Sequence, residues 1–395
     1  MRRALGCALF VLCACACGGA PSMLCDGGPC AAEDVRAERP PAGGPNCFPS
    51  YSTAMQVLAD EGGEVVKLST GQNATCALLR SGELYCWGDA NYTGVAATEP
   101  VRAPTKVLGL GAVVDVDVAT SHTCAVIADG SVFCWGFGAH GELGSSMRMS
   151  ATPVQVPAVS DAISVRTGDS GSCAILRDRT VRCWGPVDAS GASAMLRDVV
   201  EMSVGGGHTC AVLGDGSLRC LSITAEDAPG TIGRASAGQF APIAALTDVR
   251  RVVVLEGATC ALRRSGEVLC WGQNRNGDLG TSECDRDRTI STPTPVYGIA
   301  DATAICGHAA SMCAVRADFT VHCWGTGALL HQAGYSIPWA SGVPVRVPSV
   351  QSAVDCDVFG GFYARTERGG VFAWGVAGGA WNGLDPAVVE RVRVP

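Results

Sequence analysis

Lysine is nearly absent from this chain, and charged residues of either sign are sparse. Only two of the 395 residues are lysine, and Asp, Glu, Lys and Arg together make up 17%. The formal net charge is −8. A nucleic-acid-binding protein needs a clustered basic face, so this composition argues against nucleic acid as a partner. A disordered chain would carry more charge, and with 47% hydrophobic residues this one can bury a large core.

Apolar runs long enough to span a membrane are also absent. Arg2 and Arg3 precede an apolar stretch over residues 4–16, which is too short for a stable transmembrane anchor. A charged start followed by a short apolar run is typical of a secretory signal. We therefore expect an exported protein, and an oxidising compartment in which cysteines pair.

The end of this apolar run resembles a bacterial lipobox. Leu12 lies three residues before Cys15, which makes Cys15 the favoured lipid-bearing residue, and Cys17, followed by two glycines, is the competing register. Cleavage without lipid attachment remains the alternative. We expect a signal peptide over residues 1–17 and a Gly/Pro/Ala-rich tether over residues 18–50. The mature protein would be anchored by lipid in the bacterial cell envelope, or secreted.

Catalytic and cofactor motifs are missing too. The chain has no Gly-x-Ser-x-Gly elbow, no His-Glu-x-x-His run and no convincing carboxylate pair. Gly136-x-Gly138-x-x-Gly141 superficially fits a dinucleotide fingerprint, but it does not open a helix in a βαβ unit. The charged run 283–288 mixes signs and is interpreted as a solvated loop rather than a calcium site. We therefore predict no enzymatic activity, no cofactor and no metal.

What the chain does contain is a sevenfold repeat that fills residues 51–395. Six units begin with TCALLRSGELYCWG from Thr75 and continue with close variants, and the seventh, FYARTERGGVFAWG from Phe362, is degenerate. The fourth unit has Leu221 in the Trp slot. From unit to unit this slot recurs at 48, 49, 37, 50, 53 and 50 residues, so one unit is shortened.

Each unit is predicted to form a β-hairpin with further strands before and after it. Gly at the centre, as in Asp129-Gly130, supplies the positive φ of a tight turn. An apolar strand precedes each hairpin, and a Pro-x-x-Val element recurs at Pro104, Pro153 and Pro293. Three to four short strands per fifty residues, with no helical periodicity, predict an all-β, seven-bladed propeller.

The cysteines fit this hairpin. Six units contain Cys-x9-Cys, and the midpoint of each pair falls on the turn, so the two thiols face each other across the strands and can form a disulfide. The seventh unit has Tyr363 and Ala373 instead, so both thiols are lost together. Metal sites would use closer spacings. The predicted pairs are Cys76 with Cys86, Cys124 with Cys134, Cys173 with Cys183, Cys210 with Cys220, Cys260 with Cys270, and Cys313 with Cys323.

The remaining cysteines and the closing strand are left open. Cys306 and Cys356 each lie seven residues before the first Cys slot of their unit, which predicts equivalent strand positions in neighbouring blades. Cys284 could instead reach Cys306. Either residues 55–58 or residues 390–394 could supply the strand that closes the ring. The pairing is also undecided for the three cysteines of the tether, Cys25, Cys30 and Cys47.

The units resemble the RCC1 (regulator of chromosome condensation) repeat. Gly207-His208-Thr209 matches the start of its pattern, and the ten residues from Trp271 to Gly280 match its Trp-Gly…Asn-x-x-Gly-x-Leu-Gly end. The resemblance implies a seven-bladed propeller. The founding member is a chromatin-bound guanine-nucleotide exchange factor, an activity we do not expect in an acidic chain with a signal sequence. Secreted bacterial relatives include a β-lactamase inhibitor that binds its enzyme through loops on one face.

His122 and His208 occupy equivalent positions in two of the seven units. Two histidines cannot form a complete ring around a channel, so we interpret them as hydrogen-bonded structural residues. The repeated Trp-Gly is interpreted as packing between blades.

The sequence therefore predicts a monomeric, non-catalytic scaffold that binds an extracytoplasmic protein or glycan. Longer connections over residues 280–292 and 327–344 mark the expected contact regions, and the candidate binding residues are His331, Tyr335 and Trp339. An envelope polysaccharide lyase or glycosidase acting at the channel mouth is the alternative. A purely structural envelope protein is a third.

Overall fold

The computed structural model describes residues 55–57, 64–169, 171–188, 191–222, 239–243, 246–281, 288–326, 340–347, 350–359 and 362–374. All of them belong to the larger of two units, residues 43–395. The lipobox cysteines, the tether, Cys284 and the three candidate binding residues lie outside the described residues. No helix among those described is long and apolar enough to cross a membrane.

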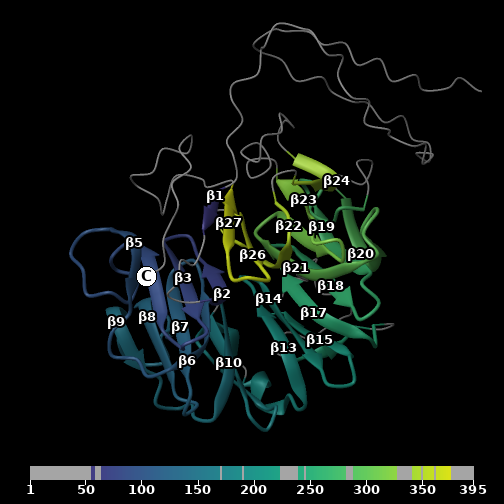
Figure 1. Cartoon of the computed structure of the whole chain (residues 1–395). Coiled ribbons are helices and arrows are strands. Elements are labelled where there is room, and N and C mark those ends of the chain that lie inside the picture. Colours follow the sequence, from purple (N-terminus) through teal and green to yellow (C-terminus); the bar gives the residue numbers. More distant parts are fainter. Residues whose placement is uncertain are drawn as a thin grey trace, which may run out of the picture. The chain divides into compact units, whose positions relative to one another are not determined.

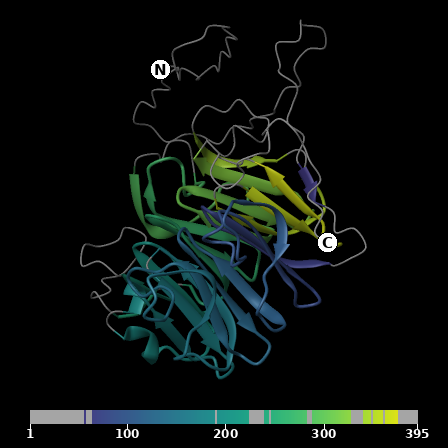
Figure 2. The same cartoon turned by 90° about the vertical axis from the view of Figure 1, so that its left-hand side faces the viewer.

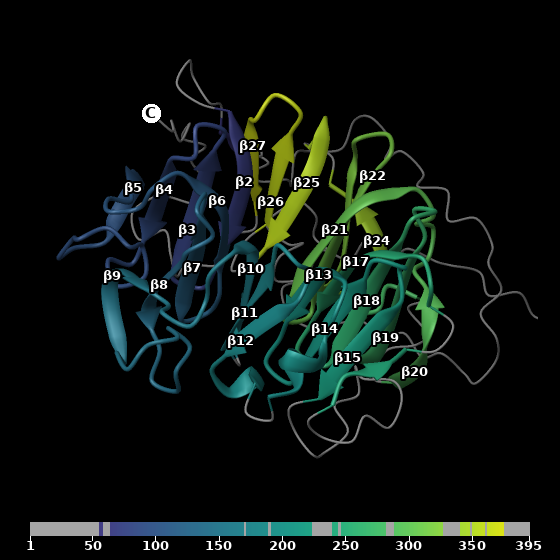
Figure 3. The same cartoon turned by 90° about the horizontal axis from the view of Figure 1, so that it is seen from below.

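The described strands form seven antiparallel sheets, confirming the predicted propeller (Figures 1 and 2). Seen from below, the sheets surround a central axis (Figure 3). The innermost strands are β2 (Val65–Thr70), β6 (Val113–Val118), β10 (Ala162–Gly168), β13 (Val199–Val204), β17 (Val249–Val254), β21 (Ala302–His308) and β25 (Ala353–Val358). The second strands are β3 (Ala74–Leu79), β7 (His122–Ile127), β11 (Gly171–Leu176), β14 (His208–Leu213), β18 (Ala258–Arg263), β22 (Ser311–Arg316) and β26 (Phe362–Thr366).

Further from the axis lie the third and fourth strands. The third are β4 (Leu84–Gly88), β8 (Val132–Phe137), β12 (Val181–Trp184), β15 (Leu218–Ser222), β19 (Val268–Asn274), β23 (Val321–Thr326) and β27 (Val371–Trp374). The fourth are β5 (Val101–Lys106), β9 (Met149–Gln155), β16 (Ala241–Pro242), β20 (Arg288–Pro295), β24 (Ala340–Arg346) and, in the seventh blade, β1 (Met55–Val57). The prolines of the repeated Pro-x-x-Val elements lie in the fourth strands, and the valines directly follow these strands.

The six predicted hairpin disulfides are all present. In each, the two cysteines are direct partners in the register of the second and third strands, as Cys124 and Cys134 are, with Cα atoms 4.0–4.1 Å apart. In the seventh blade Tyr363 is paired with Ala373, as predicted. Closing about eleven residues stabilises a hairpin by roughly 3 kcal/mol at most, because the two strands are already local.

The hairpin turns have a left-handed backbone whether or not glycine is present. Gly82, Gly130 and Gly266 have φ between 84° and 93°, as expected for their turn position. In the third and sixth blades this position is occupied by Arg179 and Phe319, with φ of 63° and 64°. The pairing on either side fixes the turn, so these two side chains are held in a conformation that costs a non-glycine residue energy.

The tryptophans pack between blades, as predicted. Trp135 and Trp324 are fully buried, and their indole N–H groups donate to backbone carbonyls in the loop of the preceding blade, at 3.0 Å in both cases. Gly94 and Gly280, at the ends of these loops, have positive φ and lie so close to the rings that a Cβ atom would be less than 3 Å from them. A wide ring therefore fills each interface while glycine allows the loop to approach it.

The third blade corresponds to the shortened unit. Its sheet has three strands, β10-β11-β12, whereas each of the other six has four. After β12 the chain passes through two short 3-10 helices, η1 (Pro186–Asp188) and η2 (Ala192–Met195), directly to β13 of the next blade. Val187 and Leu196 from this connection join the core between the blades. Two turns of helix therefore replace the missing strand in the core.

The ring is closed by the N-terminal of the two candidate strands. β1 pairs antiparallel with β27, so the first described strand completes the last blade. The alternative strand, residues 390–394, lies outside the described residues. The seventh blade is thus built from both ends of the propeller.

A seventh disulfide joins the sixth and seventh blades through Cys306 and Cys356. Their predicted equivalence was wrong by one residue. In the strand register, Cys306 lies opposite Cys313, whereas Cys356 lies opposite Ala364. The register differs because the turn after β25 is one residue shorter than its counterparts. Neighbouring strand residues point to opposite faces of a sheet. The shift therefore lets the two cysteines face each other across the interface, whereas equivalent residues would point the same way.

Candidate functional site

The central channel is the candidate site, and all seven innermost strands line it. Its volume is about 1010 Å³. Each of these strands has a β-bulge or irregularity at the same register position, shortly after its start. The residues that follow this position are Lys67, Asp115, Ser164, Glu201, Arg251, Ala304 and Asp355. Five of these seven are charged and line the channel, so the repeat places charge at one level of it.

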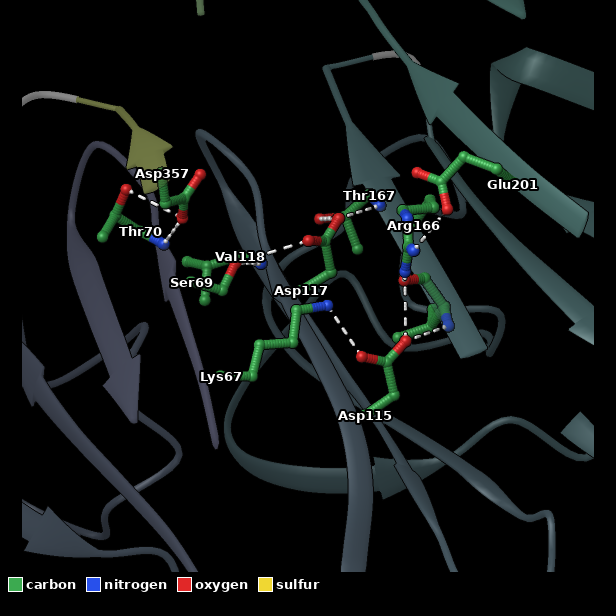
Figure 4. Close-up of polar contacts among 11 residues, drawn as sticks. Lys67, Ser69, Thr70, Asp115, Asp117, Val118, Arg166, Thr167, Glu201 and Asp357 are labelled. Carbon is green, nitrogen blue, oxygen red and sulfur yellow. Dashed lines mark hydrogen bonds and ion pairs between the residues drawn. The ribbon is translucent and has the colours of Figure 1, made fainter. Parts of the chain in front are cut away.

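Three of these charges, Lys67, Asp115 and Glu201, form a chain of ion pairs across four blades together with Arg166, which lies two residues after Ser164 (Figure 4). Lys67 Nζ lies 2.7 Å from Asp115 Oδ1, and Arg166 Nη1 lies 3.1 Å from Asp115 Oδ2. The other nitrogen, Arg166 Nη2, lies 3.1 Å from Glu201 Oε2. Burial alone would raise the pKa of Asp115, but Lys67 and Arg166 hold it below its ordinary value.

A separate ion pair joins the fifth blade to the seventh without a residue of the sixth. Arg251 Nη1 of the fifth blade lies 3.0 Å from Asp355 Oδ1 of the seventh. The intervening blade has Ala304 at the equivalent position, which leaves room for this contact. Taken together, the two networks contain three cations and three anions, so their charges cancel.

Two further aspartates accept hydrogen bonds from the neighbouring blade instead of forming an ion pair. The N–H of Thr167 donates to Asp117 Oδ2 at 2.7 Å, and the N–H of Thr70 donates to Asp357 Oδ2 at 2.8 Å (Figure 4). In both cases the threonine hydroxyl donates to the same oxygen. Burial, followed by the charge of Asp117, raises the pKa of Asp357 to about 7.

At two other interfaces between blades, a serine hydroxyl accepts the backbone N–H in place of an aspartate carboxylate. Ser69 Oγ accepts the N–H of Val118, and Ser203 Oγ accepts the N–H of Val254, each at 3.0 Å. The Cys306–Cys356 disulfide thus stands at a position that elsewhere holds a hydrogen bond between blades.

Where the innermost strands end, a more acidic and aromatic set of residues lines the channel. Asp169, which accepts a hydrogen bond from the Thr120 hydroxyl, and Glu256 are exposed there. His308 stacks on Phe359 with ring centroids 3.5 Å apart. Burial lowers the pKa of His308 to about 4, so its imidazole is neutral at neutral pH.

The two histidines of the repeat are structural, as predicted. His122 Nε2 lies 2.7 Å from the Ser172 hydroxyl, and His208 Nε2 lies 2.7 Å from the Thr259 hydroxyl, each across a blade interface. Burial lowers the pKa of both imidazoles to about 4.

The charged channel was not predicted from the sequence. Its residues lie one per blade and far apart in the chain, and only a superposition of the units on the bulge would bring them into one column. Within the described part of the chain, no group of three or more His, Cys, Asp and Glu side chains could hold a metal ion. Of the predicted contact region 280–292, the structure describes residues 280–281 and 288–292.

Comparison with known proteins agrees with the repeat. Two family models, both described as the regulator of chromosome condensation (RCC1) repeat, match this chain. One matches residues 65–94 and 257–278, and the other matches residues 129–175. These segments cover the first three strands of the first blade, part of the fifth blade, and the passage from the second blade to the third.

Solved structures share the fold at low identity. Prp20p from Saccharomyces cerevisiae is similar with a TM-score of 0.66 and 17% identity, over 78% of this chain and 82% of that one. Human WBSCR16 is similar with a TM-score of 0.65 and 15% identity, over 80% and 88% of the two chains. The family models thus match RCC1 repeats in parts of this chain, and the solved structures share its propeller fold.

Proposed function

We propose that this propeller is a non-catalytic scaffold that binds a protein outside the cytoplasm. The proposal rests on one observation: most charged side chains of the channel are already paired with groups of other blades. Lys67, Arg166 and Arg251 are each paired with a carboxylate of another blade, and Asp117 and Asp357 accept backbone N–H groups. Side chains committed in this way hold blades together. A lyase or glycosidase would need carboxylates free to exchange protons with a substrate, and the paired carboxylates of the channel are not free in this sense. The enzyme alternative would have to use the exposed Asp169 and Glu256, where the innermost strands end.

The known relatives favour a protein over a glycan as the partner. Prp20p is described by its binding to Gsp1p and histones. We carry over only the use of the propeller as a protein-binding surface. Gsp1p and histones themselves are not proposed as partners, because this chain has a net charge of −8 and an N-terminal segment for which we predict a secretory signal.

Export and anchoring are part of the proposal. Seven disulfides among the described residues are compatible with an oxidising compartment. Labelling cells with an alkyne fatty acid tests the anchor. We expect label on the parent chain and on Cys17→Ser, and none on Cys15→Ser. Label lost only with Cys17→Ser would move the site to Cys17, and an unlabelled parent would exclude lipidation.

Cross-linking on intact cells, followed by mass spectrometry, tests the binding function. We expect cross-links from one face of the propeller to one or a few envelope proteins. Removal of residues 327–339, which contain His331, Tyr335 and Trp339, should reduce these cross-links if the predicted surface is used. The absence of any protein cross-link, together with turnover of an envelope polysaccharide by the purified chain, would favour the enzyme alternative.

A further inference from the structure

Among the described residues, the third blade ends on its third strand, β12, whereas every other blade has a fourth; the connection that follows β12 contacts it through the short helices η1 and η2. In the sheet β10-β11-β12, β12 is the last strand, whereas the equivalent strands of the other blades pair with β1, β5, β9, β16, β20 or β24. The six complete blades therefore show which structure belongs at this edge and in which register.

The backbone groups that would bind a fourth strand point outward from Cys183. Cys173 and Cys183 are direct partners with Cα atoms 4.0 Å apart, which is the narrow type of antiparallel pair in which N–H and C=O groups face away from the partner strand. At the same position of the second blade, Cys134 pairs with Val154 of β9. Among the residues that the structure describes, the outward N–H and C=O of Cys183 have no hydrogen-bond partner.

The side chains at this edge are also less covered than elsewhere. Cys183 and Trp184 are half-buried, whereas Cys134, Trp135, Cys323 and Trp324 are all 0% exposed. The connection after β12 fills the core beneath the edge with Val187 and Leu196. It leaves the edge itself without a strand.

Proline distinguishes this edge from the outer edges of five of the other six blades; β1 of the seventh blade also has none. Proline on an outermost strand blocks the addition of further strands. It occurs in the fourth strands as Pro104, Pro153, Pro242, Pro293 and Pro344. β12, with the sequence Val-Arg-Cys-Trp, has none. The one blade that ends on its third strand therefore also lacks this protection.

We propose that β12 binds an extended acidic segment of a partner protein as the fourth strand of the third blade. This inference rests on the proposed function in its general form, which is protein binding, and it names a surface and a ligand class.

The complete blades define the chemistry of the segment. The fourth-strand residues that face the cysteines are small or β-branched: Thr105, Val154, Ala241, Thr294 and Val345. The next residue of such a segment faces Arg182, which is exposed and has no ion pair within the described ranges. A carboxylate at that place complements the guanidinium, and backbone hydrogen bonds supply the remaining affinity.

A peptide taken from this chain is a suitable probe. It has the sequence of residues 150–156 with Gln155→Glu, which places a valine opposite Cys183 and a carboxylate opposite Arg182. Binding of the labelled peptide to the oxidised full chain is followed by fluorescence anisotropy. We expect saturable binding, weakened at least tenfold by N-methylation of residue 154 and less than twofold by N-methylation of residue 155. Of these two residues, only 154 has an N–H that points toward the third strand when the segment lies as a fourth strand.

Three variants of the protein complete the test. Arg182→Glu should weaken binding about tenfold, whereas the matched control Arg219→Glu, at the same position of the complete fourth blade, should leave it unchanged. Replacing residues 186–198 with residues 137–161 gives the third blade its own fourth strand and should abolish binding. The Arg182 and N-methyl tests remain decisive if this graft does not fold.

The proposal is overturned if the parent chain does not bind the peptide, or if both N-methylated peptides bind equally well. It is also overturned if the chain forms a dimer that the peptide does not dissociate but that is lost in the grafted variant. That result would assign the edge to a second copy of the chain. Cross-links to envelope proteins that persist in Arg182→Glu would leave the binding function intact and reject only this surface.

Discussion

The third and seventh blades both depart from the repeat, in opposite ways. The third keeps the hairpin disulfide Cys173–Cys183 but has only three strands. The seventh has four strands but no hairpin disulfide, and the Cys306–Cys356 disulfide ties it to its neighbour. The third blade lacks a fourth strand among its described residues, and its strands come from one continuous stretch of the chain. The seventh blade is completed by β1 from the other end of the propeller, and a disulfide joins it to the sixth blade. The disulfide between blades thus lies at the blade that is built from both ends of the propeller.

Removing β1 would make the seventh blade resemble the third and should have the largest effect. A chain that starts at residue 64 has three strands in both blades and loses the pairing of β1 with β27. We expect a loss of roughly 5 kcal/mol in the free energy of unfolding, similar to the loss of a cross-link that closes a long loop. Denaturant unfolding followed by tryptophan fluorescence measures it. A loss below about 1 kcal/mol would show that closure contributes little.

The disulfide between blades is the next test. The double variant Cys306→Ala/Cys356→Ala opens a loop of about fifty residues and should cost up to about 4 kcal/mol, against up to about 3 kcal/mol for Cys173→Ala/Cys183→Ala. The second double variant is the matched control, because its hairpin keeps its register without the bond. Equal midpoints in calorimetry for the two variants would contradict a special role for the junction.

The tryptophans distinguish a complete blade from an incomplete one. Trp324→Ala removes a fully buried ring and should cost about 4 kcal/mol, whereas Trp184→Ala, at the half-buried edge of the third blade, should cost about 2 kcal/mol. Each ring also loses one hydrogen bond to a carbonyl, so the difference reports burial. A larger cost for Trp184→Ala would show that this edge is covered in solution.

The smallest expected effect concerns the link between the seventh blade and the first. Folding raises the pKa of Asp357 to about 7 and therefore favours its protonated form. This contribution to stability is complete below the unfolded pKa, near 4, and is lost as pH rises through about 7. Asp357→Asn should remove on the order of 2 kcal/mol of pH dependence between pH 4 and 7. Parallel stability profiles for parent and variant would contradict this assignment.

The sequence predicted the repeat-level features because each is local. The Cys-x9-Cys spacing, the turn glycines and the Trp-Gly pairs all lie within about fifteen residues of one another, and the register of a hairpin follows from its turn. Contacts between blades were harder to predict. The equivalence assigned to Cys306 and Cys356 failed because a turn one residue shorter shifts the register. The column of channel charges stayed hidden because its members come from different units.

Pairing of β1 with β27 sets the order in which the ring can be completed. The strand made first waits for a partner made last, so the propeller cannot close before residue 374 has been synthesised. A product truncated within the last blade has no partner for β1 and exposes a sheet edge to proteases. Closure of the ring therefore depends on synthesis of the chain at least as far as β27.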